Sequence, residues 1–291
     1  MKNIFLLTLV FMLAGLSSCS NMNIMNGQDS NVRFGVFTDA HYADVDNRGT
    51  RNYRDSLAKI SEFVVCMNNS NVDFIIELGD LKDMSDSKDP QEAIKYLQRA
   101  EKQMAEFNGP RYHVLGNHDM DCITKTQFLS NIVNSGIDAN KTYYSFDVKG
   151  VHFVVLDANF NSDSSDYANG NFDWTDANIT EKQLSWLEND LGADQSKTIV
   201  FVHQLLDGSG AVYVNNAAQV RNILEKSGRV IAVFQGHHHA GDYSKINGIE
   251  YFTVKGMVEG PGLDNNAFGI VEINGKEIEL ENTNTIIRLG K

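Results

Sequence analysis

The sequence has few prolines, only 3 in 291 residues, and after about residue 32 it has no linker rich in proline, glycine or serine. It also has no internal repeat. Instead, strand-like and helix-like stretches alternate to its end, and 42% of its residues are hydrophobic, which is enough for a sizeable core. These features favour one large domain over residues 32–291.

The chain also lacks an excess of basic residues, because its formal net charge at pH 7 is -13. Proteins that bind nucleic acids usually carry a basic patch that displaces counterions from phosphates. The composition therefore argues against a nucleic-acid partner. A protein this acidic that acts on phosphate would take its positive charge from metal ions.

The N-terminal segment differs from the rest of the chain. Lys2 is its only charged residue, residues 4–16 are largely apolar, and a Ser-Ser-Cys sequence ends at Cys19. This pattern predicts a signal peptide over residues 1–18, too short to span a bilayer. The Leu-Ser-Ser-Cys sequence also resembles a bacterial lipobox, although ordinary signal cleavage beside an incidental cysteine is the alternative. We therefore expect an exported protein, lipid-anchored in the cell envelope through Cys19, with residues 19–31 as a polar tether.

Two further cysteines, Cys66 and Cys122, lie in the expected domain. They can form one disulfide or remain two free thiols, and the sequence leaves both alternatives open.

Hydrophobic periodicity predicts an α/β domain. Apolar, β-branched runs indicate buried strands at 32–38, 72–78, 111–115, 151–157, 198–202 and 230–235. Helix-like stretches lie at about 53–68, 90–107, 124–134, 180–191 and 215–227. Short strand-like pieces at 242–246, 249–254, 267–273 and 276–282, with Asn-Gly turns between two pairs of them, indicate hairpins. The alternation of strands and helices implies layered α/β architecture.

Polar residues cluster where the predicted strands end. The clusters are Asp39 and His41 in FTDAH, Asp80 in LGD, Asn117, His118 and Asp119 in LGNHD, His203 after TIVFV, and His237 and His239 in GHHH. One such cluster alone is more often a turn. Because ligands bind outside the carboxyl ends of parallel strands, five clusters at successive strand ends predict one shared site.

The residue types in these clusters suit a pair of metal ions. Hydrolysis of a phosphate ester needs neutralised nonbridging oxygens and a nucleophilic water, and two ions about 3.5 to 4 Å apart supply both. A carboxylate can bridge two cations, and an imidazole binds one ion per ring nitrogen. Since the clusters contain no cysteine, a structural zinc knuckle is not expected.

The order Asp-x-His, Gly-Asp, Gly-Asn-His-Asp, His, Gly-His-x-His resembles that of the calcineurin-like metallophosphoesterases, over about residues 32–240. The resemblance implies a four-layer αββα sandwich and two divalent metal ions. It implies that one ion is held by Asp39, His41, Asp80 and His239, and that Asp80 bridges to a second held by Asn117, His203 and His237. It further implies that a dimetal-activated hydroxide attacks phosphorus while His118 stabilises or protonates the leaving oxygen. Asp119 would orient His118.

Longer segments, such as FGVFTDAHYAD, RNYRDSL and GDLKD, are similar to the manganese-dependent ADP-ribose/CDP-alcohol diphosphatases. This similarity implies a phosphorylated small-molecule substrate, namely a nucleotide-linked alcohol or sugar, and Mn²⁺, although the same ligands accept iron or zinc. Arg51, Tyr53 and Arg54 are candidates to grip a distal phosphate or stack on a base. A solvated helix face is the equal alternative for these three residues.

Other polar and aromatic side chains are expected to lie outside the set of metal and substrate ligands. His113 and His152 lie within predicted strands and are expected to be packed rather than metal-bound. Asp83 completes the GDxxD pattern and is expected to contact a metal ligand without binding a metal itself. Trp174 and Trp186 are expected in the core rather than as substrate platforms.

The sequence is also compatible with two other kinds of function. A phosphomonoesterase or a cyclic nucleotide phosphodiesterase would use the same metal core. A metal-loaded binding lipoprotein without activity would keep the scaffold, but it would not need His118 and Asp119, so their presence favours an enzyme.

Overall fold

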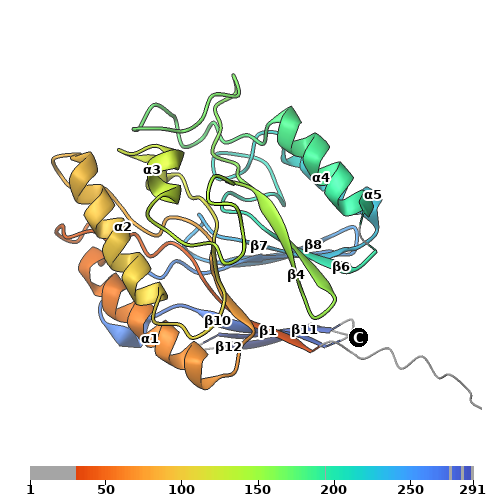
Figure 1. Cartoon of the computed structure of the whole chain (residues 1–291), viewed down its shortest axis with the longest axis horizontal. Coiled ribbons are helices and arrows are strands. Elements are labelled where there is room, and N and C mark those ends of the chain that lie inside the picture. Colours follow the sequence, from red (N-terminus) through yellow and green to blue (C-terminus); the bar gives the residue numbers. More distant parts are fainter. Residues whose placement is uncertain (1–30, 194, 275–276, 283–284, 290–291) are drawn as a thin grey trace, which may run out of the picture.

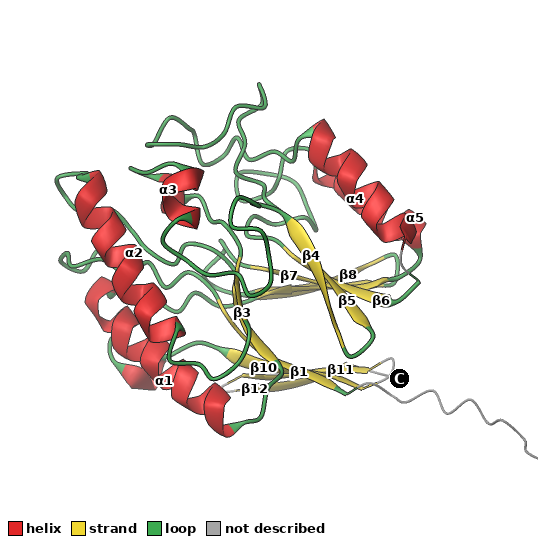
Figure 2. Cartoon of the chain, viewed as in Figure 1, coloured by secondary structure: helices red, strands yellow, loops and turns green. Residues whose placement is uncertain are grey.

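The computed structural model describes residues 31–193, 195–274, 277–282 and 285–289. Two six-stranded sheets pack face to face, and helices cover the outer face of each sheet (Figure 1, Figure 2). This arrangement confirms the αββα sandwich expected from the sequence.

The first sheet has the strand order β12-β11-β10-β1-β2-β3. Its strands are β1 (Val32–Phe37), β2 (Phe74–Glu77), β3 (Arg111–His113), β10 (Gly269–Asn274), β11 (Glu277–Asn282) and β12 (Thr285–Leu289). The first three run parallel, and β10 to β12 add an antiparallel half. Helices α1 (Ser56–Asn69) and α2 (Pro90–Met104) cover its outer face (Figure 1).

The second sheet has the strand order β4-β5-β6-β7-β9-β8. Its strands are β4 (Tyr144–Val148), β5 (Val151–Val155), β6 (Lys197–Phe201), β7 (Val230–Gln235), β8 (Asp242–Ile246) and β9 (Ile249–Thr253). Strands β5, β6, β7 and β9 run parallel, with antiparallel β4 and β8 at the edges. Helices α4 (Glu181–Ala193) and α5 (Ala217–Ser227) cover its outer face (Figure 2).

The space between the sheets is filled by aromatic side chains around Phe34. Its ring centroid lies 5.0 to 5.9 Å from those of Phe74, Phe153, Phe201 and Phe234, which come from both sheets. Such offset and edge contacts stabilise a core beyond the area they bury. This core fixes the separation of the sheets and so the position of the strand ends that carry the polar clusters.

The predicted helix over 124–134 is shorter in the structure, where α3 spans Lys125–Leu129. A capping box between Thr124 and Gln127 begins it as the sequence pattern favours. It ends early because Ser130 and Asn131 donate side-chain hydrogen bonds back to the carbonyl oxygen of Gln127. Such bonds compete with the helical ladder. Strands β4 and β12 had not been expected.

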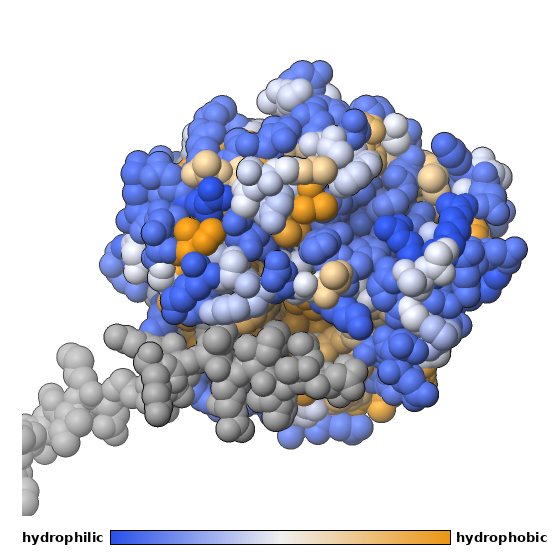
Figure 3. Space-filling model, turned by 180° about the vertical axis from the view of Figure 1, so that it is seen from behind, coloured by the Kyte–Doolittle hydropathy of each residue, from blue (hydrophilic) through white to orange (hydrophobic). Residues whose placement is uncertain are grey.

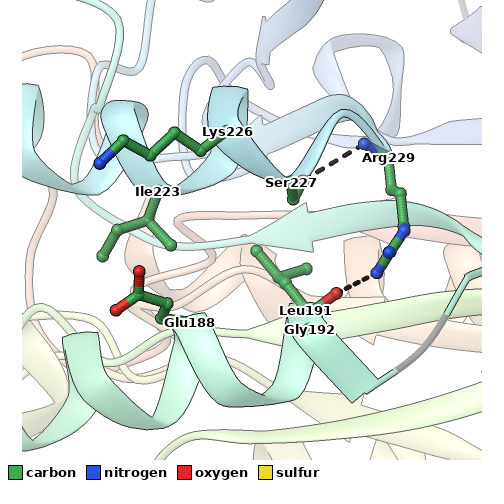
Figure 4. Close-up of a pocket in the computed structure, with 7 residues that line it drawn as sticks. All are labelled: Glu188, Leu191, Gly192, Ile223, Lys226, Ser227 and Arg229. Carbon is green, nitrogen blue, oxygen red and sulfur yellow. Dashed lines mark hydrogen bonds between the residues drawn. The ribbon is translucent and has the colours of Figure 1, made fainter.

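Arg229 joins the C-terminal ends of α4 and α5 (Figure 4). Its guanidinium donates to the carbonyl oxygen of Leu191, and its backbone N–H donates to the hydroxyl of Ser227 at 3.2 Å. A cation at the carbonyl end of a helix is favourable. The crevice of about 230 Å³ between these helices is therefore part of a structural joint.

The face shown in Figure 3 is mainly hydrophilic, with hydrophobic groups exposed at several places on it. Within the described ranges, no helix is long and apolar enough to cross a membrane. Cys66 and Cys122 are free thiols, so the two do not form a disulfide in this structure.

Candidate metal centre

The five polar clusters meet at one end of the sandwich. Three follow β1, β2 and β3 of the first sheet, and two follow β6 and β7 of the second. The sequence predicted their convergence, but the structure shows that both sheets contribute. Two groups of ligand atoms, each within 4.8 Å, contain the expected ligands: Asp39, His41 and His239 in one, and Asp80, His203 and His237 in the other. A third group, His41, Asp83 and His118, shares His41 with the first.

Asp80 lies between the two groups. Its Oδ2 is 3.2 Å from Nε2 of His203 and 3.5 Å from Nε2 of His41. Its other oxygen, Oδ1, accepts the backbone N–H of His118 at 2.7 Å. The carboxylate is thus fixed with one oxygen facing both groups, as a bridging ligand requires.

Buried atoms without partners indicate that a metal fits here. Asp39 Oδ1 and Asn117 Oδ1 are buried and make no hydrogen bond to any described residue, while His237 turns its Nδ1 to 3.2 Å from Nε2 of His203. Asp39 Oδ1 lies 3.1 Å from Nε2 of His239 without a hydrogen bond. Buried polar atoms normally have a partner, and carboxylate, carboxamide and imidazole donors are suitable ligands for divalent cations. These atoms bring Asn117 into the site, as expected.

The backbone at this site is held in unusual conformations. Four of the expected ligands have positive φ angles, namely Asp39 (51°), His41 (47°), Asp80 (58°) and His237 (63°). Non-glycine residues rarely adopt this region, and such strain concentrates at functional sites. Two motif glycines permit the close approach of the loops, because a Cβ at Gly116 would lie 2.2 Å from the Asp80 nitrogen and one at Gly236 2.1 Å from Thr38 Oγ1.

The charges within the centre are strongly coupled. Burial alone would raise the pKa of Asp80, but the neighbouring His203 and His118 outweigh burial and hold it far below its usual value. Burial opposes protonation of His203, yet the Asp80 carboxylate raises its pKa to about 10. Burial and the nearby His203 lower the pKa of His237 to about 3. At neutral pH these shifts correspond to an ionised Asp80, a protonated His203 and a neutral His237.

Three of the histidine rings are oriented through their Nδ1 atoms. Nδ1 of His41 lies 3.2 Å from Asp83 Oδ2, and Nδ1 of His203 lies 2.8 Å from a backbone carbonyl oxygen. Nδ1 of His239 lies 2.6 Å from Glu259 Oε1. These contacts leave Nε2 of each ring facing its group. Asp83 was expected in this position, whereas Glu259 was missed.

A buried lysine holds the loop that carries Glu259. Nζ of Lys59, on α1, donates to the carbonyl oxygens of Met257, Glu259 and Gly260 at 2.8, 3.1 and 2.8 Å. Burial lowers the pKa of Lys59. No sequence signal marks this residue, because lysines are mostly exposed and its partners lie about 200 positions along the chain.

The expected pairing of Asp119 with His118 is wrong. The Asp119 carboxylate accepts the backbone N–H groups of Asp80 at 3.0 Å and Gly116 at 2.9 Å, so it braces the loops instead. Asp121 takes the place beside His118, with Oδ2 2.7 Å from Nδ1. Burial would lower the pKa of His118, but Asp80 and Asp121 raise it to about 9.

The three candidate substrate-binding residues, Arg51, Tyr53 and Arg54, have different surroundings. Tyr53 is 2% exposed, so it is not a platform for a base. The guanidinium of Arg54 donates to the carboxylates of Asp44 at 2.6 Å and Asp46 at 2.9 Å, so it already has partners within the protein. Arg51 pairs through its backbone with Glu259, so its segment lies beside the His239 side of the centre.

Trp174 was expected in the core, and this expectation is wrong. Its side chain is 46% exposed, and its ring centroid lies 5.8 Å from that of His237. The preceding residue, Asp173, is fixed by the buried Tyr167, whose hydroxyl donates to its carbonyl oxygen at 3.1 Å. Trp174 is therefore an aromatic surface presented beside the metal-binding groups. Trp186 packs against Tyr143, with 4.9 Å between centroids.

Two other histidines are packed away from the centre, as expected. His113 lies between Glu77 at 3.3 Å and Glu101 at 3.0 Å. His152 lies between Asp147 at 2.7 Å and Asp190 at 2.9 Å.

Comparisons with known proteins agree with this geometry. The sequence profile of the calcineurin-like phosphoesterase family matches residues 32–241. The chain is 28% identical over 284 residues to the manganese-dependent ADP-ribose/CDP-alcohol diphosphatase of Oryza sativa subsp. japonica, covering 82% of this chain and 87% of the relative. It is 24% identical over 219 residues to a probable cyclic nucleotide phosphodiesterase of Fibrobacter succinogenes, covering 72% and 73%. A dimetal phosphatase from Danio rerio has a similar fold, with a TM-score of 0.76 at 20% identity, covering 89% of this chain and 99% of that one.

Proposed function

The chain belongs to the calcineurin-like phosphoesterase family, and on that premise we propose that it hydrolyses the diphosphate linkage of nucleoside-diphosphate-linked alcohols or sugars. As a metallophosphoesterase it is a hydrolase of phosphoester bonds. The relative from rice, named for ADP-ribose and CDP-alcohols, supports the finer assignment.

We assign the metals to the two groups of ligand atoms. Asp39, His41 and His239 would hold one divalent ion, Asn117, His203 and His237 the other, and Asp80 both. Mn²⁺ is the proposed metal, because the rice relative is named as manganese-dependent. When bound, such a pair neutralises the nonbridging oxygens of a phosphate and makes water nucleophilic.

His118 would supply the proton for the leaving oxygen. Its Nδ1 is occupied by Asp121 at 2.7 Å, so Nε2 is the ring nitrogen left to carry that proton. Its side chain is 27% exposed, which leaves room for contact with a substrate. Asp121 holds the ring in place, and Asp119 holds the loops of Asp80 and Gly116 together.

Trp174 is the observation that favours a nucleotide substrate. A half-exposed indole next to His237 offers a stacking surface for a base whose phosphates reach the metal-binding groups. A phosphate monoester without an aromatic group has nothing that would stack on it.

A substrate panel with Mn²⁺ tests the function. We expect kcat/KM for ADP-ribose and CDP-choline to exceed that for 3',5'-cyclic AMP and p-nitrophenyl phosphate. Higher kcat/KM for cyclic AMP would favour the cyclic nucleotide phosphodiesterase, which the Fibrobacter relative supports. Highest kcat/KM for the monoester would contradict the diphosphatase.

Fluorescence tests the stacking surface, because the chain has 2 tryptophans. In a Trp186→Phe background, AMP should quench the emission of Trp174, whereas ribose 5-phosphate, which lacks the base, should not. The control Trp174→Phe keeps Trp186 and should show no quenching by either ligand. Equal effects of the two ligands in the first variant would contradict stacking.

We also propose export and anchoring through Cys19, with residues 1–18 as signal peptide, 19–31 as tether and 32–291 as the enzyme domain. The signal peptide, Cys19 and most of the tether lie outside the described residues, and the proposal is supported by the sequence pattern. Cys19→Ala should move the protein from the membrane to the soluble fraction. Retention in the membrane fraction would contradict the lipid anchor.

A further inference from the structure

A pocket of about 420 Å³ lies beside the metal centre, next to His239. Thr50, Lys255, Glu259 and Asn265 are among the residues that line it. Trp174, by contrast, lies against His237, which belongs to the other group of ligand atoms. The centre therefore has an aromatic surface next to one group and a pocket with charged and polar lining residues next to the other.

The walls of this pocket are fixed within the protein. Lys59 holds three carbonyl oxygens of the segment 257–260. The backbone N–H of Gly260 donates to the carbonyl oxygen of Thr50 at 2.9 Å, and the side chain of Asn265 donates to that of Pro261 at 2.7 Å. The pocket is thus formed before a ligand enters, which lowers the cost of binding.

The charges of the lining residues define what fits. The Glu259 carboxylate is engaged with Nδ1 of His239 at 2.6 Å. Lys255 is exposed, and no ion pair in the described part of the chain includes it. None of the described lining residues is aromatic, whereas proteins recognise quaternary ammonium groups through aromatic faces. The pocket therefore offers the exposed ammonium of Lys255 together with hydroxyl and amide groups, beside a carboxylate that is turned to His239.

We propose that this pocket binds the half of the substrate that lies across the diphosphate from the base, and that it selects hydroxyl-rich groups over cationic ones. This inference rests on the proposed diphosphatase function. Sugars and polyols can bond to Thr50 and Asn265, whereas a choline group would meet the ammonium of Lys255 without an aromatic partner. Nucleoside-diphosphate sugars and polyols are then preferred to nucleoside-diphosphate cholines.

CDP-glycerol and CDP-choline form a matched pair for the test, because they share the nucleotide half and differ in the other half. With Mn²⁺ present, we expect kcat/KM for CDP-glycerol to exceed that for CDP-choline by roughly twofold to fivefold, the range for an exposed charge. Lys255→Ala should reduce this ratio towards one, and Lys255→Glu should reverse it. Lys226→Ala, on α5, removes an exposed lysine far along the chain and should leave the ratio unchanged.

The outcomes distinguish a failure of the proposed role of the pocket from a failure of the diphosphatase function. If both substrates are hydrolysed and Lys255→Ala leaves their ratio as in the wild type, the pocket does not select the substrate and this inference is overturned. A wild-type preference for CDP-choline would overturn it as well. If neither CDP compound is hydrolysed while a monoester is, the diphosphatase function itself fails, and the pocket's role with it. Thermal unfolding of each variant, which should match the wild type, shows that changed ratios do not come from misfolding.

Discussion

Asp121 lies 2.7 Å from Nδ1 of His118 and so fixes the ring that faces the metal-binding groups. The neighbouring Asp119, two residues earlier, points instead at backbone N–H groups. Both carboxylates come from the same short segment, yet one orients an imidazole and the other braces a loop. Their substitutions should therefore have different consequences.

Asp121→Ala should lower kcat by roughly 10-fold to 100-fold, the usual effect of losing a carboxylate that orients a functional histidine. Metal content and thermal stability should stay near those of the wild type, because Asp121 contacts neither group of metal ligands in the described contacts. Steady-state kinetics, metal analysis and thermal unfolding measure the three quantities.

Asp119→Ala is the matched comparison. It leaves three buried N–H groups, those of Asp80, Lys82 and Gly116, without an acceptor, at about 1 to 3 kcal/mol each, so the unfolding temperature should fall. An unfolding temperature equal to that of Asp121→Ala would show that Asp119 does not brace the loops.

His118→Ala should keep both metal ions but lower turnover by roughly 10² to 10⁴, the usual contribution of a general acid. The ring is not among the atoms assigned to the metals. Metal analysis and kcat, measured on the same preparation, check this prediction. Unchanged turnover would remove His118 from the proton transfer.

Asp80→Ala should abolish binding of both metal ions, because its Oδ2 faces both groups of ligands. The measurement is metal content per chain after dialysis against Mn²⁺. Two retained ions per chain would show that Asp80 is not the bridge.

Glu259→Ala should weaken Mn²⁺ binding at the His239 group by roughly 10-fold to 100-fold, since it removes the acceptor that orients the ring. Glu259→Gln retains an oxygen that can accept the N–H of Nδ1 and should restore most of the affinity. Calorimetric titration with Mn²⁺ gives both values. Glu188→Ala, an exposed carboxylate on α4, is the control for lost charge, and an equal loss of affinity there would contradict a specific role for Glu259.

His152 should make stability depend on pH, away from the metal centre. Its hydrogen bonds to Asp190 and Asp147 outweigh burial and raise its pKa to about 9, above the value of about 6.5 for an unfolded chain. The charged ring therefore stabilises the fold fully below pH 6.5, and this contribution is lost as the pH rises from 6.5 through 9. The difference in unfolding temperature between the wild type and His152→Gln should be largest at pH 6 and shrink by pH 9.5. A constant difference over this range would contradict the linkage.

The sequence by itself determined the layered fold and the groups that would meet at the metal centre. Buried strands are marked by local apolar runs, and the carboxyl ends of parallel strands meet by the geometry of the fold. Asp39, Asp80 and His203 could therefore be placed together without knowledge of any contact.

Only the tertiary structure decided how the groups around this centre are paired and exposed. Spacing along the chain cannot show which of Asp119 and Asp121 turns towards His118, because that depends on loop conformation. Residue type predicted burial for Trp174, but its neighbours leave it exposed. Lys59 reaches the segment that carries Glu259 from about 200 residues away, and such a contact exists only after the chain has folded, since no local pattern encodes it.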